Sequence, residues 1–203
     1  MIPRWEWRTF GGQFGEGEKK LEQFDCTRVI ETSEIYILPT IDGVNCKIRN
    51  QTLDIKLLRM VNGDKLEQWE PVFKVSFPLS ASDVREVFAA LKLPEPNDPA
   101  RQTEPTCPTG RDYRYEAFIE ELIVPVESLQ MVSVTKKRRG YRMSGAILEM
   151  ADLLVDGKKT RTVCVEHHDP DLVLEIVRDL GFDTYENINY IRAIRGIVCG
   201  EDS

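Results

Sequence analysis

The stretch VNCKIRNQTLDIKL, residues 44–57, alternates apolar residues with polar or charged ones on both sides of a tight polar turn at Asn50-Gln51. Successive side chains of a β-strand point to opposite faces, so such alternation is typical of strands with one apolar and one charged face. The stretch therefore predicts two strands, Val44–Asn50 and Thr52–Met60. Their apolar faces need a covering layer, and their charged faces need water or partners.

Similar runs recur along the chain between turn signals such as Asp156-Gly157. The further predicted strands are Arg4–Phe10, Ser33–Leu38, Glu67–Phe77, Tyr113–Val124 (which could also be helical), Leu129–Lys137, Gly140–Leu154 and Thr160–His167. About eight strands joined by short turns favour a closed antiparallel β-barrel over a parallel α/β sheet.

Helices are expected beside these strands. Ser80 or Ser82 caps a predicted helix that runs to about Lys92, with its apolar residues on one face. A second predicted helix begins at Asp169-Pro170 and ends near Leu180, before a glycine. Tyr190–Val198 is either a helix or a strand. The fold class is therefore predicted to be α+β, an eight-stranded antiparallel β-barrel with flanking helices.

The proline-rich segment Pro94–Gly110 is predicted to be an exposed loop, because strand patterns resume after it. We therefore expect residues 1–203 to form a single domain. Five scattered cysteines include no C-x-x-C pair, which argues against a zinc site or a disulfide framework and favours a reducing cytoplasm. No stretch approaches the roughly 18 apolar residues that a membrane span needs. We expect a cytoplasmic protein without a membrane partner.

Charged residues share strand faces through i, i+2 spacing. The groups are Arg4, Glu6 and Arg8; Lys47 and Arg49; Asp54 and Lys56; Lys136 and Arg138; and Cys164, Glu166 and His168. Two arrangements can accommodate them. Either the charges face bulk water around an apolar barrel core, which is the commoner case for any single strand, or they line a solvated interior while helices cover the apolar outside.

The concentration of positive charge favours the second arrangement. The chain has a formal net charge of −7, which argues against a nucleic-acid duplex as its partner. Nevertheless, residues 133–148 hold five basic residues and no acid, and residues 45–59 hold four basic residues and one acid. Like charges about 4 Å apart repel by roughly 4 kcal/mol at an effective dielectric constant near 20, so an anion is needed among them. Arginine suits phosphate because its fork makes bidentate contacts.

The ordered set of strand motifs resembles the CYTH superfamily, the triphosphate tunnel metalloenzymes. The motifs that carry the resemblance are Arg4-Trp5-Glu6-Trp7-Arg8, similar to E-x-E-x-K; Cys46-Lys47-Ile48-Arg49, similar to L-R-I-R; Leu53-Asp54-Ile55-Lys56, similar to L-T-x-K; Lys136-Lys137-Arg138-Arg139, similar to K-x-R; and the acidic segments Glu149-Met150-Ala151-Asp152 and Cys164-Val165-Glu166-His167-His168. They span nearly the whole chain.

The resemblance implies an eight-stranded tunnel in which basic residues hold a triphosphate and glutamates hold Mg²⁺ or Mn²⁺. The implied substrate ligands are Arg8, Lys47, Arg49, Lys56, Lys136 and Arg138. The implied metal ligands are Glu6, Glu149, Asp152 and Glu166, of which Glu6 and Glu166 are also the implied catalytic residues. The alternation itself leaves Glu149 and Asp152 as alternatives, since residues three apart face opposite sides of a regular strand.

The resemblance implies metal-dependent hydrolysis of inorganic triphosphate or a small organic triphosphate. A class IV-type adenylate cyclase and a non-catalytic phosphate- or nucleotide-binding protein remain alternatives, and so does a homodimer. The chain departs from the family pattern where Arg4 replaces the first acid of E-x-E-x-K and where His168 replaces the last acid of the final E-x-E. Both departures remove an expected metal ligand.

Overall fold

A computed structural model describes residues 3–94 and 110–200. Within these residues, eight antiparallel strands form a closed barrel in the order β1-β5-β4-β3-β2-β6-β7-β8, as predicted. The strands are β1 (Trp5–Gly11), β2 (Arg28–Pro39), β3 (Val44–Arg49), β4 (Thr52–Val61), β5 (Glu67–Ser76), β6 (Leu129–Met143), β7 (Ala146–Val155) and β8 (Lys158–His167). The predicted proline-rich loop lies almost entirely outside the described residues.

Five α-helices and one π-helix accompany the strands in the described part of the chain. They are α1 (Gly15–Leu21), α2 (Ala81–Ala90), α3 (Tyr115–Ala117), the π-helix η1 (Phe118–Ile123), α4 (Pro170–Leu180) and α5 (Tyr190–Cys199). None of the helices in residues 3–94 and 110–200 has the length and apolar character needed to cross a membrane.

The chain divides into two compact units. Unit 1 comprises Met1–Ser33, Leu58–Glu70 and Ser133–Ser203, and unit 2 comprises Glu34–Leu57 and Pro71–Val132. Several long strands therefore contribute one end to each unit. The two units are described separately below.

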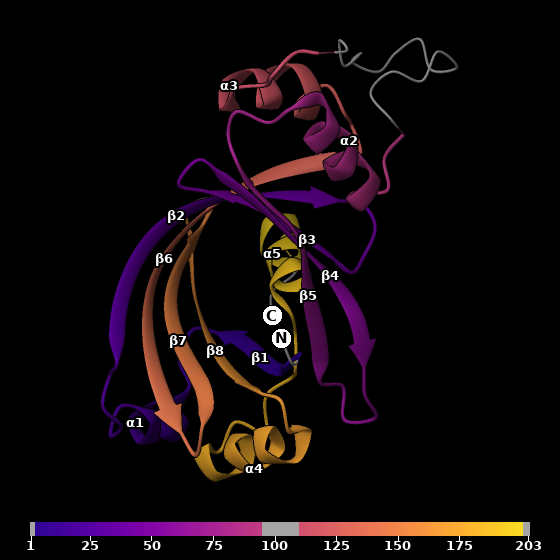
Figure 1. Cartoon of the computed structure of the whole chain (residues 1–203). Coiled ribbons are helices and arrows are strands. Elements are labelled where there is room, and N and C mark those ends of the chain that lie inside the picture. Colours follow the sequence, from indigo (N-terminus) through magenta and orange to yellow (C-terminus); the bar gives the residue numbers. More distant parts are fainter. Residues whose placement is uncertain (1–2, 95–109, 201–203) are drawn as a thin grey trace. The chain divides into compact units, whose positions relative to one another are not determined.

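In unit 1, helices cover the apolar face of the sheet. Asp169 caps α4 by accepting a hydrogen bond from the backbone N–H of Asp171, and Gly181 ends the helix at a φ of 80°. The buried residues of α4 and α1 pack against every second residue of the strands; these strand residues are Trp7, Tyr141, Leu148, Met150, Val163 and Val165. Figure 1 shows α4 at the ends of β7 and β8. The alternate residues of the same strands therefore face the other side of the sheet.

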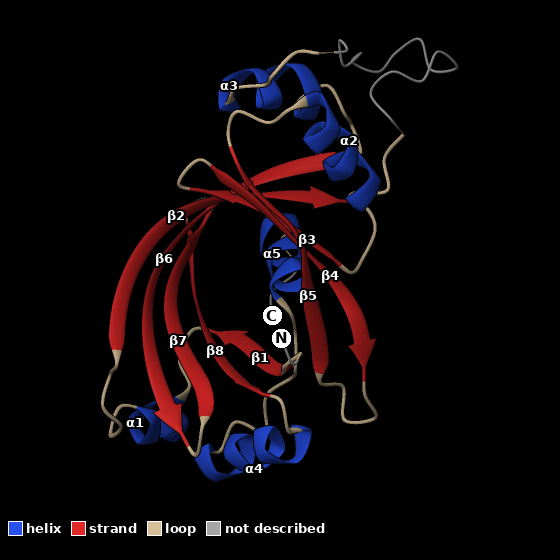
Figure 2. Ribbon diagram, in the orientation of Figure 1, coloured by secondary structure: helices blue, strands red, loops and turns tan. Residues whose placement is uncertain are grey.

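In unit 2, α2 covers the apolar face of β3 and β4. The Ser80 side chain caps α2 by accepting from the backbone N–H of Asp83, whose carboxylate in turn accepts from the Ser80 N–H. The buried side chains of α2 and of η1 join one core with those of the strands, namely Cys46, Ile48, Leu53 and Ile55. Figure 2 shows the helices α2 and α3 of this unit. The quoted stretch therefore forms the two predicted strands, and its apolar face is the buried one.

The strand predictions for two segments are wrong. Tyr113–Val124 is not a strand, because it forms α3 and η1, in which Phe118 and Leu122 are spaced one turn apart and buried. Tyr113 alone makes an isolated bridge, to Leu79. Leu129–Lys137 and Gly140–Leu154 are not separate strands either. β6 runs without interruption to Met143 and turns at residues 144–145, which both have positive φ.

The ambiguous last element is a helix. Asn189 caps α5 by accepting hydrogen bonds from the backbone N–H groups of Ile191 and Arg192. The residues before this helix run beside β1, where the Arg8 backbone N–H donates to Asn187 Oδ1 and the Arg8 carbonyl accepts from the Ile188 N–H. The pairing of β1 with β5 covers only Trp5 and Glu6, so this segment supplies hydrogen bonds to backbone groups of β1 beyond that pairing.

Candidate functional site

The charged face of unit 1 lies on the side of the sheet away from α1 and α4. The register between β1 and β8 places Glu6 opposite Glu166 and Arg8 opposite Cys164. The register between β7 and β8 places Glu149 opposite Cys164 as well. Three predicted metal ligands, one from each of three adjacent strands, therefore share one face.

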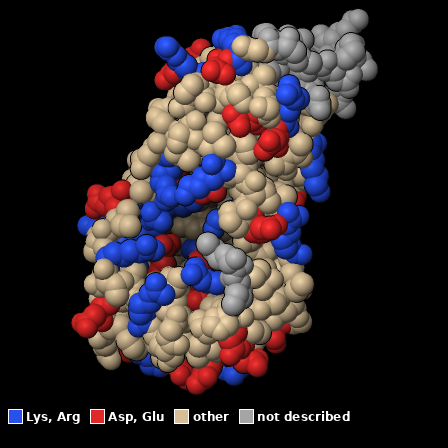
Figure 3. All heavy atoms as spheres, in the orientation of Figure 1, with Lys and Arg blue, Asp and Glu red and all other residues tan. Residues whose placement is uncertain are grey.

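Each of these three glutamates has a cationic partner. Glu6 Oε1 accepts from Arg8 Nε at 2.7 Å. The carboxylate of Glu149 lies 3.8 Å from Arg138 Nη1, and that of Glu166 lies 3.7 Å from Arg4 Nη1. The face therefore carries opposite charges in pairs. Figure 3 shows the same interspersion of Lys and Arg atoms with Asp and Glu atoms on the visible surface.

A cavity of about 290 Å³ opens on this face. Its lining includes the carboxylates of Glu149 and Glu166, the thiol of Cys164 and the cations Arg4, Arg28 and Arg142. Gly140 also lines it, and a Cβ at this position would come within 2.9 Å of the Arg28 side chain. Glycine at position 140 therefore leaves room for a cation beside the cavity.

Arg8 is buried beneath the first residue of α5. Its guanidinium carbon lies 4.4 Å from the centroid of the Tyr190 ring, and Nη1 donates to Thr162 Oγ1 at 3.3 Å. Lys136, also buried, places Nζ 4.0 Å from the same ring centroid. The Tyr190 ring contacts both cations and stabilises them by cation–π attraction. Phe10 packs edge-on against Tyr190 at a centroid distance of 5.1 Å.

The electrostatics of this face keep Arg8 charged and Cys164 neutral at neutral pH. Burial by itself lowers the pKa of Arg8, but Cys164, Glu6 and other neighbours raise it well above its ordinary value. Burial raises the pKa of the Cys164 thiol well above its ordinary value, and the nearby carboxylates Glu6, Glu166 and Glu149 add to this increase against the effect of Arg8.

The carboxylates of this face fit a hard divalent cation. Glu6, Cys164 and Glu166 each offer a donor atom, and these atoms all lie within 4.8 Å of one another. Carboxylate oxygens are the ligands that Mg²⁺ and Mn²⁺ prefer, whereas a protonated thiol is a poor ligand for either ion. The set that fits is therefore Glu6 and Glu166, with Glu149 across the ladder from Cys164.

The charged face of unit 2 is organised around Glu34, which the sequence did not single out. The carboxylate of Glu34 is fully buried, 3.3 Å from Arg49 Nη1 and 3.5 Å from Lys47 Nζ. Asp54 lies opposite Lys47 in the neighbouring strand, and Lys56 follows Asp54 on the same face. Burial lowers the pKa of Lys47, with help from Arg49 and Lys56 and against the carboxylates of Glu34 and Asp54.

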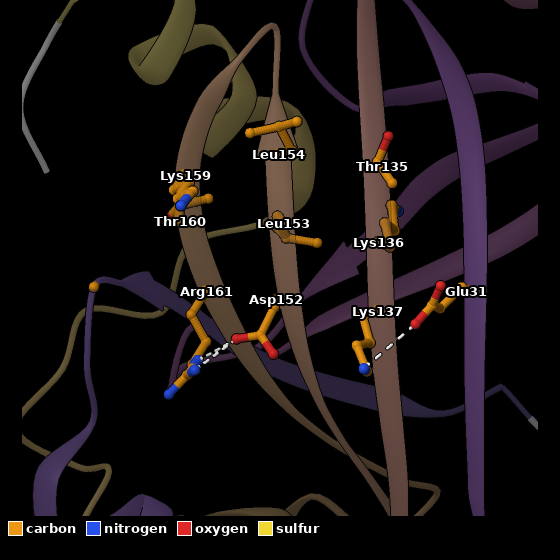
Figure 4. Close-up of a pocket in the computed structure, with 11 residues that line it drawn as sticks. Glu31, Thr135, Lys136, Lys137, Asp152, Leu153, Leu154, Lys159, Thr160 and Arg161 are labelled. Atoms are coloured by element: carbon orange, nitrogen blue, oxygen red, sulfur yellow. Dashed lines mark hydrogen bonds and ion pairs between the residues drawn. The ribbon is translucent and has the colours of Figure 1, made fainter.

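Asp152 faces the opposite side of unit 1 from the three glutamates. Its carboxylate lies 2.6 Å from Arg161 Nη2 and 3.2 Å from Arg139 Nη2. It lines a separate groove of about 590 Å³ that also includes Lys137 and Glu31, 3.4 Å apart. Figure 4 shows the Asp152–Arg161 and Lys137–Glu31 contacts across neighbouring strands. The structure thus brings Glu6, Glu149 and Glu166 together and leaves Asp152 apart.

The rings of the two histidines of the last acidic motif contact each other at a tilt just before α4. Their ring centroids are 3.9 Å apart, and His167 Nδ1 accepts from the backbone N–H of Asp169. β8 ends at His167, so His168 lies outside the strand. The alternation of strand faces, which predicts His168 on the same face as Glu166, therefore does not apply to it.

Sequence reasoning missed Glu34 and Tyr190. Glu34 directly precedes the apolar run Ile35–Leu38 of β2, and an acid beside such a run is itself a signal, because it needs a cationic partner when it is buried. Tyr190 follows the helix cap Asn189 but reaches Arg8 from the far end of the chain. No local pattern encodes that contact.

No family model and no curated protein matches the sequence. Solved structures do match. The candidate adenylyl cyclase HpAC1 of Hippeastrum, described as having a dominant triphosphatase activity, is 9% identical with a TM-score of 0.51, and the match covers 95% of each chain. A candidate adenylate cyclase of Bacillus halodurans is 12% identical with a TM-score of 0.53, over 95% of this chain and 98% of that one. At these identities the likeness concerns the fold.

Proposed function

We propose that this chain, whose barrel has the fold of the CYTH superfamily, hydrolyses a triphosphate with the help of a divalent metal ion. The observation that carries the proposal is the charged face of unit 1. Three glutamates on adjacent strands each face an arginine there, beside a cavity of about 290 Å³. Phosphoryl transfer needs both signs of charge, because cations hold the phosphate oxygens and carboxylates hold a metal ion or water.

The basic residues bind and orient the substrate. In unit 1 these are Arg8, Lys136 and Arg138. Arg8 and Lys136 are buried against Tyr190 and therefore have little freedom to lose when an anion binds. In unit 2 the proposed phosphate ligands are Lys47, Arg49 and Lys56. Guanidinium and ammonium groups stabilise charge on the phosphate oxygens, which is the larger part of catalysis for this reaction class.

The acidic residues hold the cation and the water. Glu6, Glu149 and Glu166 are the proposed ligands of Mg²⁺ or Mn²⁺, which when bound supplies Lewis-acid polarisation of a phosphoryl oxygen. We assign Glu149 in place of Asp152, because Asp152 faces the other side of the sheet with Arg139 and Arg161. A glutamate oxygen of Glu166 accepts a hydrogen bond from the attacking water, which cleaves triphosphate to diphosphate and phosphate.

The test is phosphate release from inorganic triphosphate and from ATP, with Mg²⁺ or Mn²⁺ and with chelator. Release that depends on the metal ion supports the proposal, and no release from either substrate at any metal concentration contradicts it. Formation of cyclic AMP and diphosphate from ATP would instead support the class IV-type cyclase.

One contact favours a second candidate, a phosphate-binding protein without turnover. Arg4 lies where the family pattern has an acid, and its guanidinium faces Glu166 at 3.7 Å. A cation in this place competes with a metal ion for the same carboxylate. Tight triphosphate binding by calorimetry, unchanged by chelator and without phosphate release, is the result that this candidate predicts.

A further inference from the structure

Glu34 stands between two of the proposed phosphate ligands. Its carboxylate has no exposed surface, and its two oxygens lie 3.3 Å from Arg49 Nη1 and 3.5 Å from Lys47 Nζ. The register between β2 and β3 pairs Ile35 with Ile48 and Tyr36 with Lys47, and Glu34 lies next to this ladder in β2.

Removing a charged carboxylate such as that of Glu34 from water costs free energy, and its contribution to the fold does not by itself account for that cost. A buried charged group can nevertheless be retained where it fixes the positions of the charged side chains that pair with it. Arg49 is about one-third exposed on its side chain and Lys47 about one-sixth, while Glu34 is fully covered. The two cations are therefore more accessible to an anion in solvent than the carboxylate that they contact.

We propose that Glu34 is a positioning residue and resident counter-ion, which fixes Lys47 and Arg49 and sets how tightly this pair binds a phosphate group. With Glu34 the three side chains sum to one positive charge, whereas the two cations alone would carry two. The affinity for an anion is therefore lower than the cations by themselves would give, which favours release of a phosphate product. The inference rests on the proposed function only in naming a triphosphate as the anion.

The sign of the effect separates this role from a merely structural one. Glu34→Gln keeps the shape and an oxygen that can accept from Arg49, but removes the charge. We expect the variant to bind inorganic triphosphate roughly tenfold more tightly by calorimetry without metal, since a nearby unit charge in a partly buried site has about this effect. Glu34→Asp, which keeps the charge, should bind closer to wild type.

The matched control is Glu121→Gln. It removes one negative charge from the same unit, but Glu121 is half-exposed and paired with Arg111. We expect its affinity for triphosphate to stay at the wild-type value. A Glu34→Gln variant that binds as wild type does, or more weakly, overturns the inference.

If Glu34→Gln does not fold, as judged by its thermal unfolding curve, two lysine variants decide the matter. In Lys47→Gln the charges of Glu34 and Arg49 cancel. In Lys56→Gln the side chains of Lys47, Arg49 and Glu34 are all kept, with their net charge of one positive. Lys47→Gln should therefore lose several-fold more triphosphate affinity than Lys56→Gln. Equal losses would overturn the inference.

A sulfate series keeps this inference separate from the proposed function. Sulfate needs only a pair of cations, and we expect it to raise the unfolding temperature of Glu34→Gln more than that of wild type. If wild type binds no triphosphate but this difference is present, the proposed function fails and the role of Glu34 stands. If wild type binds triphosphate but Glu34→Gln shows neither tighter binding nor a larger sulfate response, the inference about Glu34 fails and the proposed function stands.

Discussion

The charged faces of the two units solve the same electrostatic problem in different ways. In unit 1 each of three glutamates has its own arginine, at 2.7 to 3.8 Å. In unit 2 one buried carboxylate, that of Glu34, is shared by Lys47 and Arg49. On the first face each glutamate is paired one to one, and further cations such as Lys136 and Arg142 lie beyond these pairs. On the second face two cations share a single buried carboxylate.

The difference suits the unit 1 face to the reaction and the unit 2 face to binding of the anion. A face with one cation for each carboxylate offers oxygen ligands and phosphate ligands together, as a reaction centre needs. On the unit 2 face the Glu34 carboxylate is fully buried against Lys47 and Arg49, so this face is suited mainly to attract an anion through its cations. Substitutions of the unit 1 glutamates should therefore act mainly on turnover, and substitutions of cations on either face mainly on affinity.

The largest effect is expected for Glu166→Gln in unit 1. The amide keeps the volume but offers a weaker oxygen ligand and no negative charge. We expect metal-dependent phosphate release to fall by about 100-fold or more, because one charged group at a reaction centre contributes this much. Triphosphate affinity measured by calorimetry should be retained. Equal turnover in variant and wild type would remove Glu166 from the site.

A second comparison lies within unit 1, between its two faces. Glu149→Gln should lower turnover by about tenfold, because Glu149 shares a face with Glu6 and Glu166. Asp152→Asn is the matched control: it changes an acid three residues away, whose carboxylate pairs with Arg161 on the opposite side. The reverse ranking of these two variants in a phosphate-release assay would show that β7 presents Asp152 to the substrate.

Neighbouring arginines of β6 allow a similar test of binding. Arg138→Ala should raise the dissociation constant for triphosphate by about tenfold, the usual magnitude for a charge-assisted hydrogen bond. Arg139→Ala removes the same charge from the face that carries Asp152 and should have little effect on binding. Both side chains are partly exposed, so thermal unfolding should show that both variants fold. A larger loss for Arg139→Ala would reverse the assignment.

The smallest effect concerns pH and unit 2. Since burial lowers the pKa of Lys47, this lysine loses its proton at a lower pH than an ordinary lysine does. Triphosphate affinity should therefore decline by a few-fold as the pH is raised toward the alkaline range, before free lysines titrate. Lys47→Arg, whose guanidinium stays charged, should remove this decline in calorimetry at a series of pH values. A decline of the same size in the arginine variant would exclude Lys47 as its source.

The alternation of residue types was enough to predict much of the fold. It located β1, β3, β4 and β8 and, through the charged faces, the side of each strand that lies away from α1, α2 and α4. Capping chemistry located α4 between Asp169 and Gly181. The predicted eight-stranded antiparallel barrel is confirmed, and two solved structures share this fold.

Other features were beyond local patterns. The segment Tyr113–Val124 mixes apolar and charged residues in a way that fits a strand or a helix, and only the packing of Phe118 and Leu122 in the unit 2 core decides for helices. Glu34 was missed because the search for charged faces relied on pairs of charges two residues apart, and Tyr36 follows Glu34 at that spacing. The catalytic roles of Glu6 and Glu166 remain predictions.

The backbone of Arg8 bonds to Asn187 and Ile188, and its guanidinium lies under Tyr190. The Arg8 N–H and the Asn187 oxygen that it bonds are 179 residues apart in the chain. During synthesis β1 emerges long before these partners, so this corner of the charged face is completed late, after nearly every other described element has been made. Such distant contacts slow folding. A nascent chain arrested before Asn187 would expose Arg8 to proteases that cannot reach it in the finished protein.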